Sequence, residues 1–148
     1  MDLFERRRLL LVDRKFYIYK SGDSSIEATI LQNRRTFYAD HLLLWKYSYL
    51  IAHVEDITQY HSLNFELAFS SAVTEPAYIG YSNNSSETMN GALSNGALSG
   101  TRKKDITSTE RTVYSFDITA ADAGYNFIKI LNHNEGGDTL KIYNIWLE

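Results

Sequence analysis

The chain has 148 residues, which is enough for one domain with a substantial hydrophobic core. Its 44% hydrophobic content excludes intrinsic disorder, and its net charge of −3 excludes a general nucleic-acid binder, which needs a net positive field. It has no cysteine, which excludes disulfides, thiolate nucleophiles and zinc–thiolate sites. No apolar run approaches the roughly 20 residues of a membrane helix, so no membrane insertion is expected.

The first thirteen residues differ in character from the rest of the chain. Three arginines at positions 6–8 precede only four apolar residues, and no small-residue cleavage site follows them. This pattern favours a short arm or one helical turn over a signal peptide, with a basic binding tag as the less favoured alternative. We therefore expect an arm over residues 1–13 and a single domain over residues 14–148.

From residue 14 onwards the hydrophobic pattern has the period of two that is typical of β-strands. The clearest case is Leu63–Phe69, in which four large apolar side chains share one face. No amphipathic helix is evident beyond the N-terminal turn. In chain order, the expected strands are Phe16–Lys20, Ile26–Leu31, Thr36–Tyr38, one or two within His41–Val54, Leu63–Phe69, Ala77–Tyr81, Val113–Ile118, Asn126–Leu131 and Thr139–Leu147.

Turn signals separate these strands. Residues 132–138 contain a Gly-Gly pair typical of a hairpin, and the only proline, Pro76, lies between two strands. Residues 82–111 are rich in Asn, Ser, Gly and Thr and are expected to form a long loop or hairpin excursion. About eight or nine short strands of this kind predict an all-β, antiparallel β-sandwich of jelly-roll type, with a closed barrel as the alternative.

Three stretches carry a resemblance to a known family. They are FYIYKSGD at residues 16–23, EDITQYHSLNFELAF at residues 55–69, and the C-terminal strands from Ser115 to Glu148. Together they resemble galactose-binding-like β-sandwich modules at the C-termini of phage or prophage tail proteins from Gram-positive gut bacteria, and FERRRLLLV resembles the linker that precedes such modules. One departure is Ser24-Ser-Ile-Glu27, where the commoner modules have a glycine-tryptophan pair.

The resemblance implies a galactose-binding-like jelly roll that binds glycans or serves in adhesion and assembly. The implied partners are a cell-surface glycan, other tail proteins or further copies of the chain. The implied location is the virion, or the bacterial cytoplasm when the protein is expressed from a prophage.

No pattern in the chain predicts catalysis or a metal site. There is no Gly-x-Ser-x-Gly motif, and the four histidines lack the spacing of paired metal ligands. No catalytic residue, metal or cofactor is therefore expected, and a fragment of a carbohydrate-active enzyme is a minor alternative. A structural calcium is less favoured than ordinary turn chemistry, because no acidic loop of fixed spacing exists. Its candidate ligands would be Asp23, Glu27, Asp138 and Glu148.

The aromatic side chains are the main functional lead. Trp45, Tyr47 and Tyr49 recur at every second position, which would place three rings on one strand face as a sugar platform or, more favoured, as a core wall. Other aromatic and amide groups lie at strand–loop junctions. The candidate ligand-binding residues are Trp45, Tyr47, Tyr49, Tyr81, Asn83 and Tyr125. The leading hypothesis is a non-catalytic module that binds surface carbohydrate, and the alternative is an assembly domain that oligomerises through its tyrosine-rich sheet.

Overall fold

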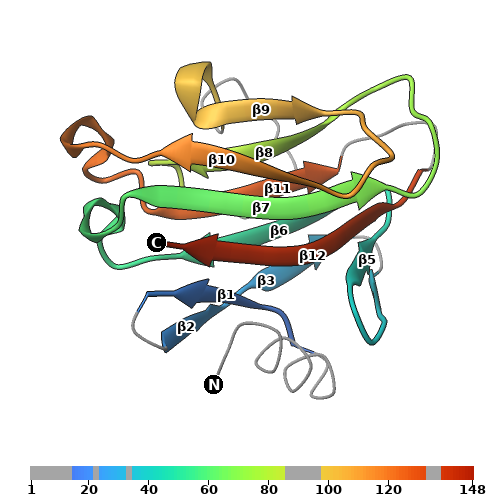
Figure 1. Cartoon of the computed structure of the whole chain (residues 1–148), viewed down its shortest axis with the longest axis horizontal. Helices are drawn as coiled ribbons and strands as arrows, with labels where there is room; N and C mark the ends of the chain where they lie inside the picture. Colours follow the sequence, from blue (N-terminus) through green and yellow to red (C-terminus); the bar gives the residue numbers. More distant parts are fainter. Residues whose placement is uncertain (1–14, 22–23, 33–34, 86–97, 133–137) are drawn as a thin grey trace.

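The computed structural model describes residues 15–21, 24–32, 35–85, 98–132 and 138–148. They form two β-sheets packed face to face, which confirms the predicted all-β sandwich (Figure 1). The expected arm over residues 1–13, Asp23 and the Gly-Gly tip of the last hairpin lie outside the described residues.

Sheet A has seven strands, and its centre is the C-terminal strand. One edge of that strand pairs with the strand Ser62–Phe69. The other edge pairs with two short strands, Tyr17–Lys20 and Leu42–Leu44. All pairings are antiparallel except that of the first strand with the last, which is parallel. The strands are β1 (Tyr17–Lys20), β2 (Ser24–Glu27), β4 (Arg35–Phe37), β5 (Leu42–Leu44), β7 (Ser62–Phe69), β10 (Thr112–Asp117) and β12 (Leu140–Leu147).

Sheet B has five strands in the order β3-β6-β11-β8-β9, and all its pairings are antiparallel. The strands are β3 (Thr29–Gln32), β6 (Ser48–His53), β8 (Ala77–Ser82), β9 (Lys103–Ile106) and β11 (Phe127–Asn132). Three single 3₁₀ turns complete the described elements, and none of these short helices could cross a membrane. They are η1 (Ile57–Gln59), η2 (Gly100–Arg102) and η3 (Ala120–Asp122).

Two details of the strand pattern differ from the sequence-based expectation. The expected strand Ile26–Leu31 is two strands, because the chain passes from sheet A to sheet B at Ala28. Ala28 is buried, and its backbone N–H donates to the carbonyl of Phe16 at 2.8 Å. Residues 82–111, expected to form a long loop or a hairpin excursion, contain β9, a polar edge strand that was not among the expected strands and that pairs antiparallel with β8.

The main core lies between the sheets. Leu63, Phe65, Leu67 and Phe69 alternate inwards from β7, and each is at most 1% exposed. A second, smaller cluster lies on the outer face of sheet B, where Tyr49 and Leu131 pack with Leu98 from the segment that precedes η2. The outer face of sheet B is thus partly covered.

Candidate functional site

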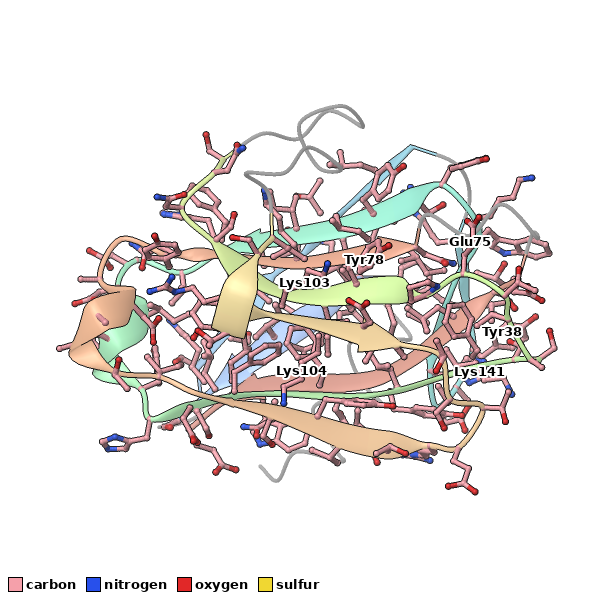
Figure 2. All side chains as sticks on the ribbon, turned by 90° about the horizontal axis from the view of Figure 1, so that it is seen from above. Tyr38, Glu75, Tyr78, Lys103, Lys104 and Lys141 are labelled. Atoms are coloured by element: carbon pink, nitrogen blue, oxygen red, sulfur yellow. The ribbon has the colours of Figure 1, made fainter. Side chains whose placement is uncertain are left out.

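A pocket of about 330 Å³ opens at the edge of the sandwich, where β9 of sheet B lies beside β10 of sheet A. We call it the edge pocket. Figure 2 looks onto this edge and shows Lys104 on the side of β9 that faces β10, with Lys103 on the opposite side. The residues that line the edge pocket are Tyr81, Thr101, Arg102, Lys104, Ser115, Phe116, Asp117, Thr119, Ala121 and Asp122.

Two aromatic rings from opposite sheets contribute to the lining. Tyr81 of β8 and Phe116 of β10 point inwards, and their rings meet edge to face at 5.5 Å between centroids. Tyr81 is only 2% exposed, and burial, together with the nearby Asp122 carboxylate, raises the pKa of its hydroxyl to about 12. The pocket therefore has an apolar base and a hydroxyl that stays protonated at neutral pH.

One wall of the edge pocket is a fixed ion pair. The Nε of Arg102 donates to Oδ1 of Asp122 at 2.7 Å, and its Nη2 donates to the carbonyl of Ala121 at 3.0 Å. The guanidinium also stacks on Tyr125, 3.6 Å from the ring centroid. Burial lowers the pKa of Arg102, but the hydrogen bond and charge of Asp122 outweigh it, and the net pKa is raised. Arg102 is therefore held as a cation in one orientation.

Gly80 allows this wall to approach the sheet. Its φ of +157° is unfavourable for residues with side chains, and a Cβ at this position would collide with the backbone carbonyl of Arg102. η2 can therefore lie directly against β8 only because position 80 has no side chain.

The rest of the lining carries two further charged groups, Lys104 and Asp117. Within the part of the chain that the structure describes, neither Lys104 nor Asp117 forms an ion pair or a side-chain hydrogen bond. The ammonium of Lys104 lies 5.2 Å from the ring centroid of Phe116, and Asp117 is exposed at the end of β10. One donor group and one acceptor group are thus available to a ligand above an aromatic base.

The structure brings together only part of the predicted aromatic set. Tyr81 lines the edge pocket, and Tyr125 lies beneath Arg102. Asn83 follows β8 as an exposed residue and is not part of the pocket lining.

The predicted row of Trp45, Tyr47 and Tyr49 along one strand is wrong. β6 begins only at Ser48, and Trp45 and Tyr47 lie in the turn before it. Tyr47 has a φ of 58°, which is outside the β region and ends the two-residue period. Trp45 is half-buried and its Nε1 donates to Oγ1 of Thr36 at 3.3 Å, whereas Tyr49 is 1% exposed on the outer face of sheet B.

The candidate calcium ligands do not converge. In the described ranges no three His, Asp or Glu side chains are grouped to hold a metal ion. Glu27 lies 3.9 Å from Lys15, and Asp138 accepts a hydrogen bond from Ser71 at 2.7 Å. Glu148 accepts from Nε1 of Trp146 at 2.8 Å.

Comparison with solved structures shows which fold this is, although no protein-family model and no curated protein matches the chain. A point mutant of a family 29 carbohydrate binding module is 14% identical, with a TM-score of 0.52, and the match covers 88% of both chains. A mutant of the family 29 module CBM29-2 complexed with cellulohexaose is 14% identical, with a TM-score of 0.50, and the match covers 88% of this chain and 87% of that one. The chain thus has the β-sandwich fold of carbohydrate binding modules.

Proposed function

We propose that this chain is a non-catalytic carbohydrate-binding module and that the edge pocket holds the sugar. The observation that carries the proposal is that the edge pocket presents an ammonium, Lys104, and a carboxylate, Asp117, and that neither forms an ion pair or a side-chain hydrogen bond with any described residue. Sugar hydroxyls both donate and accept hydrogen bonds, and the C–H faces of a sugar pack on aromatic rings. The pocket offers a donor and an acceptor for these hydroxyls, and the rings of Tyr81 and Phe116, 2% and 3% exposed, form its apolar base.

The charge of the pocket favours an uncharged saccharide. Its two cations, Arg102 and Lys104, are balanced by two carboxylates, Asp117 and Asp122. A volume of about 330 Å³ is at the lower end of the range of about 300–1,000 Å³ for ligand pockets. We therefore expect a short saccharide or the end of a glycan chain. The fold supports this function, because the family 29 structures that share it are described as carbohydrate binding modules.

A glycan array followed by calorimetry with the best ligand tests the proposal. Lys104→Met and Asp117→Asn should each weaken binding about tenfold or more, since each removes a hydrogen bond that involves a charged group. Lys103→Met is the matched control, because Lys103 is the neighbouring residue on the same strand and lies on its other side (Figure 2). If no glycan binds, the function is wrong. If only Lys103→Met weakens binding, the sugar site is on the outer face of sheet B instead.

The proposal also includes self-association of the chain and its membership of a phage or prophage tail protein. Two large apolar side chains of the described residues are exposed, Tyr38 at 48% and Val113 at 47%. A self-association surface would bury one or both of these side chains. Light scattering at high protein concentration tests assembly, and the gene neighbourhood tests whether the chain belongs to a phage tail protein.

A further inference from the structure

Two buried polar groups on the outer face of sheet B have no hydrogen-bond partner among the described residues. Lys129 and Tyr49 are each 1% exposed, and neither the Nζ of Lys129 nor the Oη of Tyr49 forms a hydrogen bond with any described residue. Proteins rarely bury such groups unsatisfied, because each loses its bonds to water without replacement. The pair therefore requires an explanation that the edge pocket does not provide.

Strand register places these groups on one face of neighbouring strands. Ile128 and Ile130 of β11 point into the main core, so Lys129 between them points to the outer face. Lys129 lies opposite Ile51 of β6, and Tyr49 lies opposite Leu131. The two side chains are thus diagonal neighbours across the β6–β11 pair, at a separation that long side chains bridge.

Both unpartnered groups are hydrogen-bond donors. A lysine ammonium has three donors and no acceptor, and a protonated tyrosine hydroxyl donates one hydrogen. Burial raises the pKa of Tyr49 to about 12, so its hydroxyl keeps this proton at neutral pH. Asp105, a carboxylate on the same face at the edge strand, is more than half exposed and pairs with Lys103 at 3.5 Å. The missing partner is therefore an acceptor, and a negatively charged one matches a lysine best.

We infer that the outer face of sheet B holds a second ligand site, in which Lys129 and Tyr49 bind the negatively charged group of an acidic sugar. This site differs from the edge pocket in position and in charge, since its two unpartnered groups are both donors. Lys103 and Tyr78 lie beside each other on the same face, with the ammonium 4.5 Å from the ring centroid, and are half-exposed (Figure 2). They form the accessible side of the site, and Leu98 packs beside Tyr49 and Leu131.

The test compares three forms of one sugar by calorimetry and NMR titration of the full chain: galacturonate, galactose 6-phosphate and galactose. We expect at least one acidic form to bind more tightly than galactose, and the preferred acid identifies carboxylate or phosphate as the ligand group. Lys129→Met, which keeps the volume and removes the donor, should weaken binding of the acidic form on the order of tenfold or more. Tyr49→Phe should weaken it as well, and this variant serves the test if Lys129→Met fails to fold.

Denaturation of the same variants separates a ligand site from a merely structural lysine. Removal of an unsatisfied buried donor should raise the unfolding midpoint of Lys129→Met while binding is lost. Lys141→Met, on the outer face of sheet A and outside both sites, should leave binding of the acidic sugar unchanged. The inference is overturned if neither acidic form binds better than galactose, or if Lys129→Met binds it as tightly as the natural chain. Neither outcome affects the edge pocket, which is tested with its own variants and a neutral glycan.

Discussion

The carboxylate of Asp122 joins the two sides of the edge pocket. Its Oδ1 accepts from Nε of Arg102 at 2.7 Å, and its Oδ2 accepts from the backbone N–H of Thr119 at 2.8 Å. The second bond completes a capping box that fixes η3, since the side chain of Thr119 in turn accepts from the backbone of Ala121. One carboxylate, only 5% exposed, therefore orients the cation of the pocket and the turn beside it.

Replacement of Asp122 should lower the free energy of unfolding more than replacement of a carboxylate in an exposed ion pair. We expect Asp122→Ala to lower the free energy of unfolding by about 2–4 kcal/mol, because it leaves Arg102 without its partner and removes a cap. Asp105→Ala is the control, since it breaks the exposed pair with Lys103 and should cost at most about 1 kcal/mol. Urea denaturation measures both. Equal losses for the two variants would contradict the structural role assigned to Asp122.

How much of the fold could be read from the sequence depended on burial. The strand Leu63–Phe69 was predicted correctly because one of its faces forms the core, which imposes a strict period of two. The bounds of β9 were missed because Lys103–Ile106 is a polar edge strand without a hydrophobic period, so the region was left open between a loop and a hairpin excursion. The break at Ala28 was also missed, since the passage between sheets depends on tertiary packing.

The candidate site was predictable only in part. Tyr81 and Tyr125 were selected for their place at strand–loop junctions, and both lie at the edge pocket or beside it. The pairing of Arg102 with Asp122 was missed because the two residues are 20 positions apart and meet only through the fold. A local signal did exist, because Thr119-x-x-Asp122 has the spacing of a capping box. This motif predicts a helical turn whose carboxylate accepts a backbone hydrogen bond.

Substitution of Gly80 should destabilise the fold more than substitution of another glycine with positive φ. Gly80→Ala should lower the free energy of unfolding by about 1–3 kcal/mol, because the new Cβ meets the carbonyl of Arg102. It should also weaken glycan binding, since Arg102 is displaced from the pocket wall. Gly124→Ala is the control: its φ is +87°, but a Cβ there would meet nothing within 4 Å. Thermal denaturation and calorimetry should show a loss of binding for Gly80→Ala alone.

Glycan binding should depend on the shape of the Arg102 guanidinium as well as on its charge. Lysine keeps the charge but cannot bond Asp122 and the Ala121 carbonyl while it stacks on Tyr125. We therefore expect Arg102→Lys to weaken binding of the neutral glycan about tenfold. Arg111→Lys is a close control, because Arg111 stacks on Tyr143 at 3.8 Å and bonds Glu66 but lies outside the pocket. Glycan binding that responds equally to both changes would show a general loss of stability rather than a local effect.

Stability should depend on pH at the alkaline end in two opposite ways. Burial lowers the pKa of Lys129 below its ordinary value of 10.5, so the folded chain releases this proton at a lower pH than the unfolded chain. Between these two pKa values the unfolded state binds more protons, and stability rises with pH. Tyr49 and Tyr81 act in the other direction. Burial raises their pKa from 10.0 to about 12, so above pH 10 the unfolded chain loses protons that the folded chain keeps, and stability falls.

Denaturation of the natural chain and of Lys129→Met across this range separates the two effects. Lys129→Met should be more stable than the natural chain by about 1–3 kcal/mol at neutral pH, because it removes a buried, unpartnered amine. The difference should shrink as pH rises towards and past 10.5, because the amine is neutral in both states only above the pKa of the unfolded chain. The fall above pH 10 should persist in Lys129→Met and diminish in Tyr49→Phe. A stability difference that is constant with pH would mean that Lys129 keeps its ordinary pKa and is solvated in the folded chain.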